Sequence, residues 1–496
     1  MSQFTEIRTA PGTVRGSWED DVAVFRGIPF AQPPVGSLRF QAPVAPRPWS
    51  GTRDALAFGP SVPQAGQPGS VMTSTTEVPA DGSAECLTLN VWTPDLGAAA
   101  LPVMVWIQGG TYLENHTANP HYDGALLAQS GVVVVSMNYR VGLDGFGHIA
   151  GAPDNRGLLD QIAALRWVGD NIAAFGGDPD RVTVFGQSAG AACTAALLTM
   201  PTATGLFRRA ICQSMPGTYF SQRLAATVTE AIAGELGARA DLDDLTRCTP
   251  RALTEATATV LAKMPRFAES WGPVALTPTP FSPVVDGTVL PDAPWRALAG
   301  GAARGIDLLV GHTRDEFRLY TSGTEAVDPF DHLPPGRDLR HAYAAAYPEA
   351  STAQRREILN ADWLFRMPSV HLAESARMGG ARAWMYELRW SFSAEQGASH
   401  CLDFLLLFGT LGADEVRRHR AAHPGAADEV SGVSRALRAD WVEFATTGEP
   451  GWDPYAPPGR TTRVYDATAT VGPYPEERSR RIWSTHRFGT LDLLSG

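Results

Sequence analysis

The stretch RVTVFGQSAGAACTAALLTM (181–200) holds the pattern that decides the fold. An apolar run of strand length comes first, a helix of small residues comes last, and the pentapeptide GQSAG (186–190) lies at their junction. G-x-S-x-G alone is a weak signal, but between a strand and a helix it is typical of a sharp turn that lifts a serine hydroxyl above a sheet. Such a turn strains the backbone of Ser188 and leaves no room for side chains at 186 and 190, where both residues are glycine. Ser188 is therefore a candidate nucleophile, placed where a helix dipole favours negative charge.

Strand and helix alternate on both sides of this stretch. Continuous apolar runs, typical of strands buried on both faces, occur at 103–108 and 132–139, and further strands are predicted at 208–214 and 307–312. Residues 155–175 carry apolar side chains at helical spacing, and the first 60 residues have the short alternating runs of antiparallel strands. The pattern predicts an α/β fold with a mostly parallel, twisted central sheet and helices on both faces.

The chain has 496 residues, of which 44% are hydrophobic and 19% charged, and this balance excludes a disordered or fibrous protein. We expect a single domain over 1–496. Helix-rich, less regular segments at about 216–300 and 320–380 are interpreted as insertions over the sheet.

Charge and cysteine content narrow the partners. The net charge is −11 and no basic cluster stands out, so no nucleic-acid partner is expected. The longest apolar runs have strand length, and the N-terminus shows no secretory signal, so we expect no membrane contact and a cytoplasmic location. Five widely spaced cysteines without a C-x-x-C pair predict free thiols and no metal site.

A nucleophilic serine needs a base and an orienting carboxylate, which in this class of fold follow the serine in the order acid, histidine. His400 lies on a loop, GASH, just before the apolar run FLLLF (404–408). The acid follows the strand DLLVGH (307–312), at the strand end where ligand sites occur. The residues alone leave Glu316 and its neighbour Asp315 equally suited to that role.

These residues, read together, resemble the type-B carboxylesterases, the family of the cholinesterases and the bacterial p-nitrobenzyl esterases. The resemblance extends from about residue 10 to about residue 455. It rests on FRGIPFAQPPVGSLRF (25–40), ECLTLNVWTP (85–94), the block from Asn155 to Ala191, RDE (314–316) and GASHCLDFLLLFGT (397–410). It implies an α/β-hydrolase fold with Ser188 as nucleophile, Glu316 as triad acid and His400 as base.

The resemblance also implies an oxyanion hole made by the backbone N–H groups of Gly110, Thr111 and Ala189. The loop WIQGGTY (106–112) departs from the family pattern at Gln108, usually His or Tyr, and at Thr111, usually Gly or Ala. We expect the β-branched Thr111 to narrow the site or tilt its own N–H. Ser214 matches a serine that supports the triad, although Met215 replaces the glycine that usually follows it.

The resemblance implies two further expectations, one about Cys86 and one about cation binding. In secreted relatives the cysteine at the position of Cys86 pairs with an upstream cysteine, where this chain has Val62, so Cys86 should be unpaired. Cholinesterases hold a cation on a tryptophan whose nearest equivalent here is Thr76, in a segment without aromatics (73–82).

The sequence therefore predicts a hydrolase of small to medium neutral carboxylic esters that forms an acyl-enzyme and needs no cofactor or metal. A monomer is expected, although the sequence does not fix the oligomeric state. An acyltransferase, lactonase or cyclase that uses the same acyl-serine is the alternative. A non-catalytic binding protein is disfavoured because Ser188, Glu316 and His400 are all present.

Overall fold

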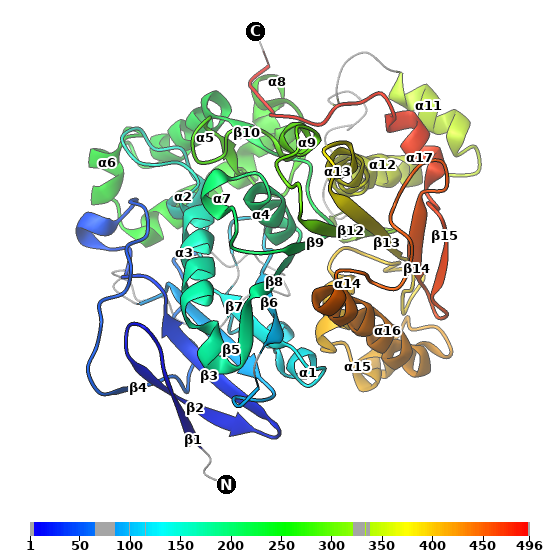
Figure 1. Ribbon diagram of the computed structural model, residues 1–496. Helices are drawn as coiled ribbons and strands as arrows, with labels where there is room; N and C mark the ends of the chain where they lie inside the picture. The colour runs from blue at the N-terminus through cyan, green and yellow to red at the C-terminus, as the bar shows by residue number, and fades with distance from the viewer. Residues whose placement is uncertain are drawn as a thin grey trace.

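One large sheet organises the molecule (Figure 1). The computed structural model describes residues 4–64, 85–98, 100–114, 116–320, 333 and 338–494. Within these, the strands are β1 (Phe4–Arg8), β2 (Thr13–Glu19), β3 (Val22–Pro29), β4 (Thr52–Asp54), β5 (Thr88–Thr93), β6 (Leu101–Ile107), β7 (Val133–Met137), β8 (Gly177–Gln187), β9 (Arg209–Gln213), β10 (Phe220–Ser221), β11 (Val284–Val285), β12 (Asp307–Thr313), β13 (Arg382–Leu388), β14 (Thr461–Tyr465) and β15 (Thr470–Pro473).

The helices lie between and around these strands. They are α1 (Ala125–Ala128), α2 (Gly142–Phe146), α3 (Arg156–Asn171), α4 (Ala189–Leu197), α5 (Gln222–Gly234), α6 (Leu242–Arg247), α7 (Pro250–Lys263), α8 (Ala268–Trp271), α9 (Pro294–Ala299), α11 (Leu339–Ala346), α12 (Thr352–Ala361), α13 (Met367–Met378), α14 (Leu402–Phe408), α15 (Ala413–Arg418), α16 (Ala426–Thr447) and α17 (Glu477–Trp483). No helix in the described ranges is long and apolar enough to cross a membrane.

The strand order confirms the predicted α/β fold. The order is β1-β2-β3-β5-β7-β6-β8-β9-β12-β13-β14-β15, and β4 pairs with β2. Every pair from β7 to β14 is parallel, whereas the pairs at the two edges, from β1 to β7 and between β14 and β15, are antiparallel. The predicted antiparallel N-terminal segment is therefore also present. Strand β13 had no counterpart among the strands that we expected from the sequence.

Alternation along the buried strands explains the two layers of helices. In β6, Val103, Val105 and Ile107 point into an apolar cluster with α3, α4 and α13. Met104 and Trp106 point the other way, into a second cluster with α14 and α16. Successive side chains of a strand face opposite sides of its sheet, so a strand that is apolar at every position must be covered on both faces.

The helix-rich segments fall where the sequence predicts insertions. Helices α5 to α9 occur between β9 and β12, and α11 to α13 between β12 and β13; both groups gather in the upper half of Figure 1. Helix α4 ends at Leu197, before the expected residue 200, because the chain turns into a 3-10 segment that starts with Pro201.

Candidate active site

Ser188 occupies a strained turn between β8 and α4. Its backbone has φ 57° and ψ −127°, outside the regions that residues other than glycine normally adopt. A Cβ at Gly186 would lie 2.5 Å from the carbonyl oxygen of Gly190, and one at Gly190 would lie 2.0 Å from that of Ile107. The turn therefore requires glycine at both positions, as the sequence predicts. The Ser188 side chain is held at the N-terminus of α4 and the residue keeps 7% of its surface exposed.

A histidine and a carboxylate meet beside this turn. His400 lies just before α14 and Glu316 just after β12, and His400 Nδ1 is 2.5 Å from Glu316 Oε2. The backbone N–H of Thr313 donates to the other carboxylate oxygen at 2.8 Å. Both side chains are buried. Burial alone would raise the pKa of Glu316, but the charge and hydrogen bond of His400 outweigh it, and the pKa lies below its usual value.

Asp315, the other sequence candidate, points elsewhere. It forms an ion pair with Arg314, 2.9 Å between Oδ2 and the guanidinium nitrogen, and accepts a hydrogen bond from the N–H of Ala398 at 2.8 Å. Its pKa is lowered because these hydrogen bonds and charges outweigh the effect of burial. The geometry therefore places Glu316, and not Asp315, against His400.

Two residues near the pair were not predicted. The ring of Phe365, on the π-helix η8 (Asp362–Arg366), packs on the imidazole of His400 with 4.3 Å between centroids. The side-chain amide of Gln187 lies 3.1 Å from His400 Nε2. A π-helix is rare and occurs often at functional sites, but the sequence of η8 carries no pattern that announces it.

The hydroxyl of Ser188 makes no hydrogen bond to any described residue. In this structure His400 Nε2 contacts the side-chain amide of Gln187 instead. Ser214, at φ 53°, is fully buried, and its hydroxyl lies close enough to Glu316 to help lower the pKa of that carboxyl. That hydroxyl does not meet full hydrogen-bond geometry with any group in the described segments.

The loop after β6 lies against the serine. A Cβ at Gly109 would be 3.0 Å from Ser188 Cβ. Gly110, Thr111 and Tyr112 all have positive φ, of 111°, 56° and 59°. The Gly110 carbonyl accepts hydrogen bonds from the N–H of Leu113 at 2.9 Å and from the Thr111 hydroxyl at 2.7 Å. The loop and the first turn of α4 thus converge on one side of Ser188.

The departure at Gln108 has a visible consequence. Its side chain is buried, and neither amide atom finds a hydrogen-bond partner within the described segments. Its backbone carbonyl accepts a hydrogen bond from the Tyr139 hydroxyl at 2.5 Å, which fixes the start of the loop. Thr111 and the adjacent Tyr112 both have backbone angles in the left-handed region, a conformation that L-residues rarely adopt. The narrowing of the site expected from Thr111 stays a prediction.

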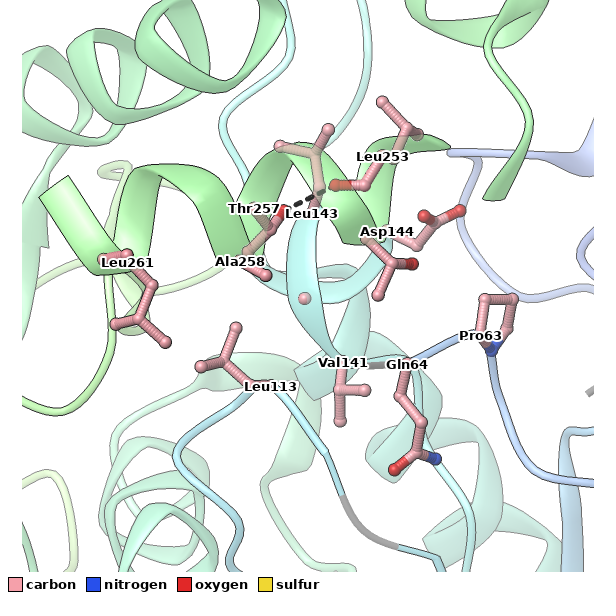
Figure 2. Close-up of a pocket in the computed structure, with 13 residues that line it drawn as sticks. Pro63, Gln64, Leu113, Val141, Leu143, Asp144, Leu253, Thr257, Ala258 and Leu261 are labelled. Atoms are coloured by element: carbon pink, nitrogen blue, oxygen red, sulfur yellow. Dashed lines mark hydrogen bonds between the residues drawn. The ribbon is translucent and has the colours of Figure 1, made fainter. Parts of the chain in front are cut away.

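An apolar pocket of about 400 Å³ borders the same loop (Figure 2). Leu113, Val141 and Leu143 form one side, and α7 contributes Leu253 and Leu261 to the other. The polar groups at its wall are engaged within the protein: the hydroxyls of Thr254 and Thr257 donate to backbone carbonyls of α7 at 2.7 and 2.8 Å, and Asp144 lies 3.6 Å from an arginine nitrogen. The pocket thus offers mainly carbon to a ligand.

The remaining sequence predictions concern a metal site, the cysteines and the segment 73–82. The described residues contain no cluster of His, Cys, Asp and Glu that could hold a metal ion. All five cysteines have free thiols; Cys86 is buried, and Val62 stands where a partner would be. Thr76 and the segment 73–82 lie outside the described residues.

Comparison with known proteins identifies the family of this chain. Residues 3–469 match the carboxylesterase family. The chain is 39% identical to the para-nitrobenzyl esterase of Bacillus subtilis (strain 168), covering 96% of this chain and 97% of that protein. It is 36% identical to the phenmedipham hydrolase of Pseudarthrobacter oxydans, covering 96% of each.

Solved structures give the same result. A PNB esterase superimposes with a TM-score of 0.83 at 37% identity, covering 96% of this chain and 99% of that one. A carboxylesterase of Geobacillus stearothermophilus superimposes with a TM-score of 0.81 at 33% identity, covering 97% of this chain and all of the other. The chain therefore belongs to the carboxylesterase family and is a serine hydrolase of carboxylic esters.

Proposed function

We propose that Ser188, His400 and Glu316 form the catalytic triad of this esterase. One observation carries the assignment: a buried imidazole with Nδ1 2.5 Å from the Glu316 carboxylate, beside a serine on a strand–helix turn. His400 Nε2 takes the proton as Ser188 Oγ attacks the ester carbonyl, and Glu316 orients the ring and stabilises the cation. His400 then returns the proton to the leaving alcohol, and water repeats the sequence on the acyl-serine.

We infer that the backbone N–H groups of Gly110, Thr111 and Ala189 stabilise the tetrahedral oxyanion. Gly109 lies close to Ser188 and directly precedes Gly110, and Ala189 opens α4, where the helix dipole adds positive potential. One such donor typically contributes roughly 10²–10³ in turnover. Ser214 is proposed to support the triad by holding the ionised form of Glu316.

The substrates we propose are small to medium neutral esters with an apolar group. The pocket of Figure 2 supports this proposal, because its lining among the described residues is mainly apolar and its Thr254, Thr257 and Asp144 side chains are engaged within the protein. The similar protein of Bacillus subtilis is a para-nitrobenzyl esterase, and we propose that this chain also hydrolyses para-nitrobenzyl esters. Acyl transfer, lactonase or cyclase activity is not favoured, because these relatives are hydrolases.

We further propose a single domain and a reducing, cytoplasmic compartment. One sheet runs from the N-terminal β1 to β15 near the C-terminus, which supports a single cooperative unit. Five free thiols support a reducing compartment. The expected monomer stays a prediction.

The decisive experiment is Ser188→Ala. Hydrolysis of p-nitrophenyl butyrate should fall by at least about 10³-fold, because without the nucleophile only oxyanion and binding contributions remain. A serine-directed phosphonate should label the wild type once, at Ser188, and leave the variant unlabelled. Thermal unfolding of the variant should match the wild type. Full turnover in a folded Ser188→Ala protein would exclude the proposed mechanism.

A further inference from the structure

Gln187 contacts the base on the side that faces the nucleophile. It is the last residue of β8, directly before Ser188, and is 1% exposed. Its amide nitrogen lies 3.1 Å from His400 Nε2, and its carbonyl oxygen accepts from the thiol of Cys401 at 3.7 Å. The side chain of Gln187, the residue before the nucleophile, thus contacts both the base His400 and Cys401, the residue after the base.

The hydrogen-bond network fixes where the protons lie. His400 Nδ1 is 2.5 Å from the Glu316 carboxylate, which can only accept, so the neutral imidazole carries its proton on Nδ1. Nε2 then has a lone pair, and the group 3.1 Å away must donate to it. The amide N–H of Gln187 meets this requirement. A glutamine at this position therefore binds, in the resting enzyme, the same lone pair that must receive the proton of Ser188, so the amide N–H has to leave Nε2 before the serine proton is transferred.

After proton transfer the requirement reverses. The imidazolium has a proton on Nε2 and needs an acceptor, which the amide N–H cannot be. Rotation of the Gln187 amide by half a turn would bring its oxygen to His400. Cys401 tolerates either orientation, because a thiol both donates and accepts weakly. Burial raises the pKa of Cys401 well above its usual value, so the thiol keeps the proton that the resting arrangement uses.

We propose that Gln187 is a positioning residue for the base: its amide donates to neutral His400 in the resting enzyme and accepts from the imidazolium after rotation, with Cys401 as the alternate partner. This proposal rests on the proposed triad. It goes beyond it by giving the residue before the nucleophile a role in which both ends of a neutral amide are used. A carboxylate of similar length can only accept and so would serve the imidazolium alone. An apolar side chain of similar length would serve neither state of the base.

Besides Cys401, which loses its Gln187 partner in a Gln187 variant, three further titratable side chains of the described segments lie around His400. Glu316 faces the ring from the loop after β12, Asp403 from α14 and Tyr320 from the segment after β12. Asp403 is itself held by the hydroxyl of Tyr386 at 2.7 Å and by the amide of Gln213 at 3.1 Å, and burial raises its pKa. A change in the pH profile of a Gln187 variant therefore reports on the Gln187 contact.

The experiment compares Gln187→Glu and Gln187→Met with wild type, using Gln161→Met as the matched control. Gln161 is a buried glutamine on α3, and its side chain lies against Cys193 of α4. Each protein is titrated with phosphonate to count active sites, and kcat and kcat/KM for p-nitrophenyl butyrate are measured from about pH 5 to about pH 9.

The two substitutions have different expected results. Gln187→Glu places a carboxylate beside the imidazolium and favours the charged base, so the acid limb of kcat/KM should move to higher pH by about one unit or more. Gln187→Met removes the orienting bond, so kcat should fall about five- to tenfold while KM changes less than twofold. Gln161→Met should reproduce the wild-type profile.

Two results would overturn the proposal. One is an acid limb for Gln187→Glu that superimposes on the wild-type limb. The other is an equal loss of kcat in Gln187→Glu and Gln187→Met with no shift in either profile, which would reduce Gln187 to a packing role. Either result, combined with an inactive Ser188→Ala protein, leaves the triad assignment standing and rejects only the role of Gln187.

Discussion

Asp315 and Ala398 are joined by a pair of hydrogen bonds: the Asp315 N–H donates to the Ala398 carbonyl at 2.9 Å, and the Ala398 N–H donates to Asp315 Oδ2 at 2.8 Å. This pairing ties the loop after β12 to the loop that carries His400, two residues further on. Adjacent carboxylates therefore have different tasks. Glu316 touches the imidazole, and Asp315 holds the segment that presents it.

Glu316→Ala should lower kcat by roughly 10³-fold or more, since the imidazole loses its orienting carboxylate. Asp315→Ala should lower kcat by less than about tenfold and should lower Tm, because it removes loop hydrogen bonds and an ion pair. Steady-state kinetics and thermal unfolding of both variants check this. A greater loss of kcat in folded Asp315→Ala would mean that the acid has been assigned to the wrong residue.

Choline esters should have no advantage over neutral isosteres. The segment equivalent to the cation-binding part of cholinesterases has no aromatic residue, and two other candidates, Trp271 and Tyr112, are each only 1% exposed. A cation should therefore lack the roughly 0.5–2 kcal/mol that an aromatic face provides. The measurement is kcat/KM for butyrylcholine against 3,3-dimethylbutyl butyrate. A tenfold preference for the cation would contradict this view of the pocket.

Thiol titration of the denatured, unreduced protein should find five reactive groups, because all five cysteines are free in the structure. The native protein should react more slowly. Cys86, Cys193 and Cys212 are buried, and burial raises the pKa of the first two to about 12 and that of Cys212 further. Three or fewer thiols in the denatured protein would reveal a disulfide.

Stability should depend on pH through Glu387, which lies fully buried in β13, 4.0 Å from His312. Burial, together with the charge of Glu476, raises the pKa of Glu387 to about 8. The folded chain therefore keeps a proton that the unfolded chain loses near pH 4.5, and the free energy of unfolding falls as pH rises from there to about 8.

Glu387→Gln removes this titration. Urea unfolding should show that the stability of the variant relative to wild type increases steadily between about pH 5 and about pH 8. A difference in unfolding free energy that stays constant over this range would show that Glu387 is already ionised in the folded protein.

The sequence predicted the parallel sheet, including strands β6 and β8, because those signals are local. The apolar runs that became β6 and β8 and the glycines at 186 and 190 each reflect contacts within a few residues or a simple periodicity. Glu316 could be separated from Asp315 only by resemblance. Neighbouring residues share the same local pattern, and their different directions depend on the loop at 397–399.

The parts that the sequence did not predict depend on distant contacts. Gln187 meets His400 across 213 positions of the chain, and Phe365 reaches the same ring from a π-helix. Neither contact produces a residue spacing or a local composition that could be recognised in a single sequence. Strand β13 shows the same limit, since it forms between a long helix and a loop and gains its partners, β12 and β14, from far away.

Strand order has a consequence for how such an enzyme can change. Ser188 follows β8 and Glu316 follows β12, and β9 alone lies between these strands. Neighbouring strands lie about 4.8 Å apart, so the distance between the two positions is determined by the hydrogen-bonded strands of the sheet and not by the inserted helices. Natural drift or directed evolution can therefore reshape α7 and its neighbours to admit new esters while Ser188 and Glu316 keep their spacing. That separation makes the chain suited to laboratory diversification of specificity.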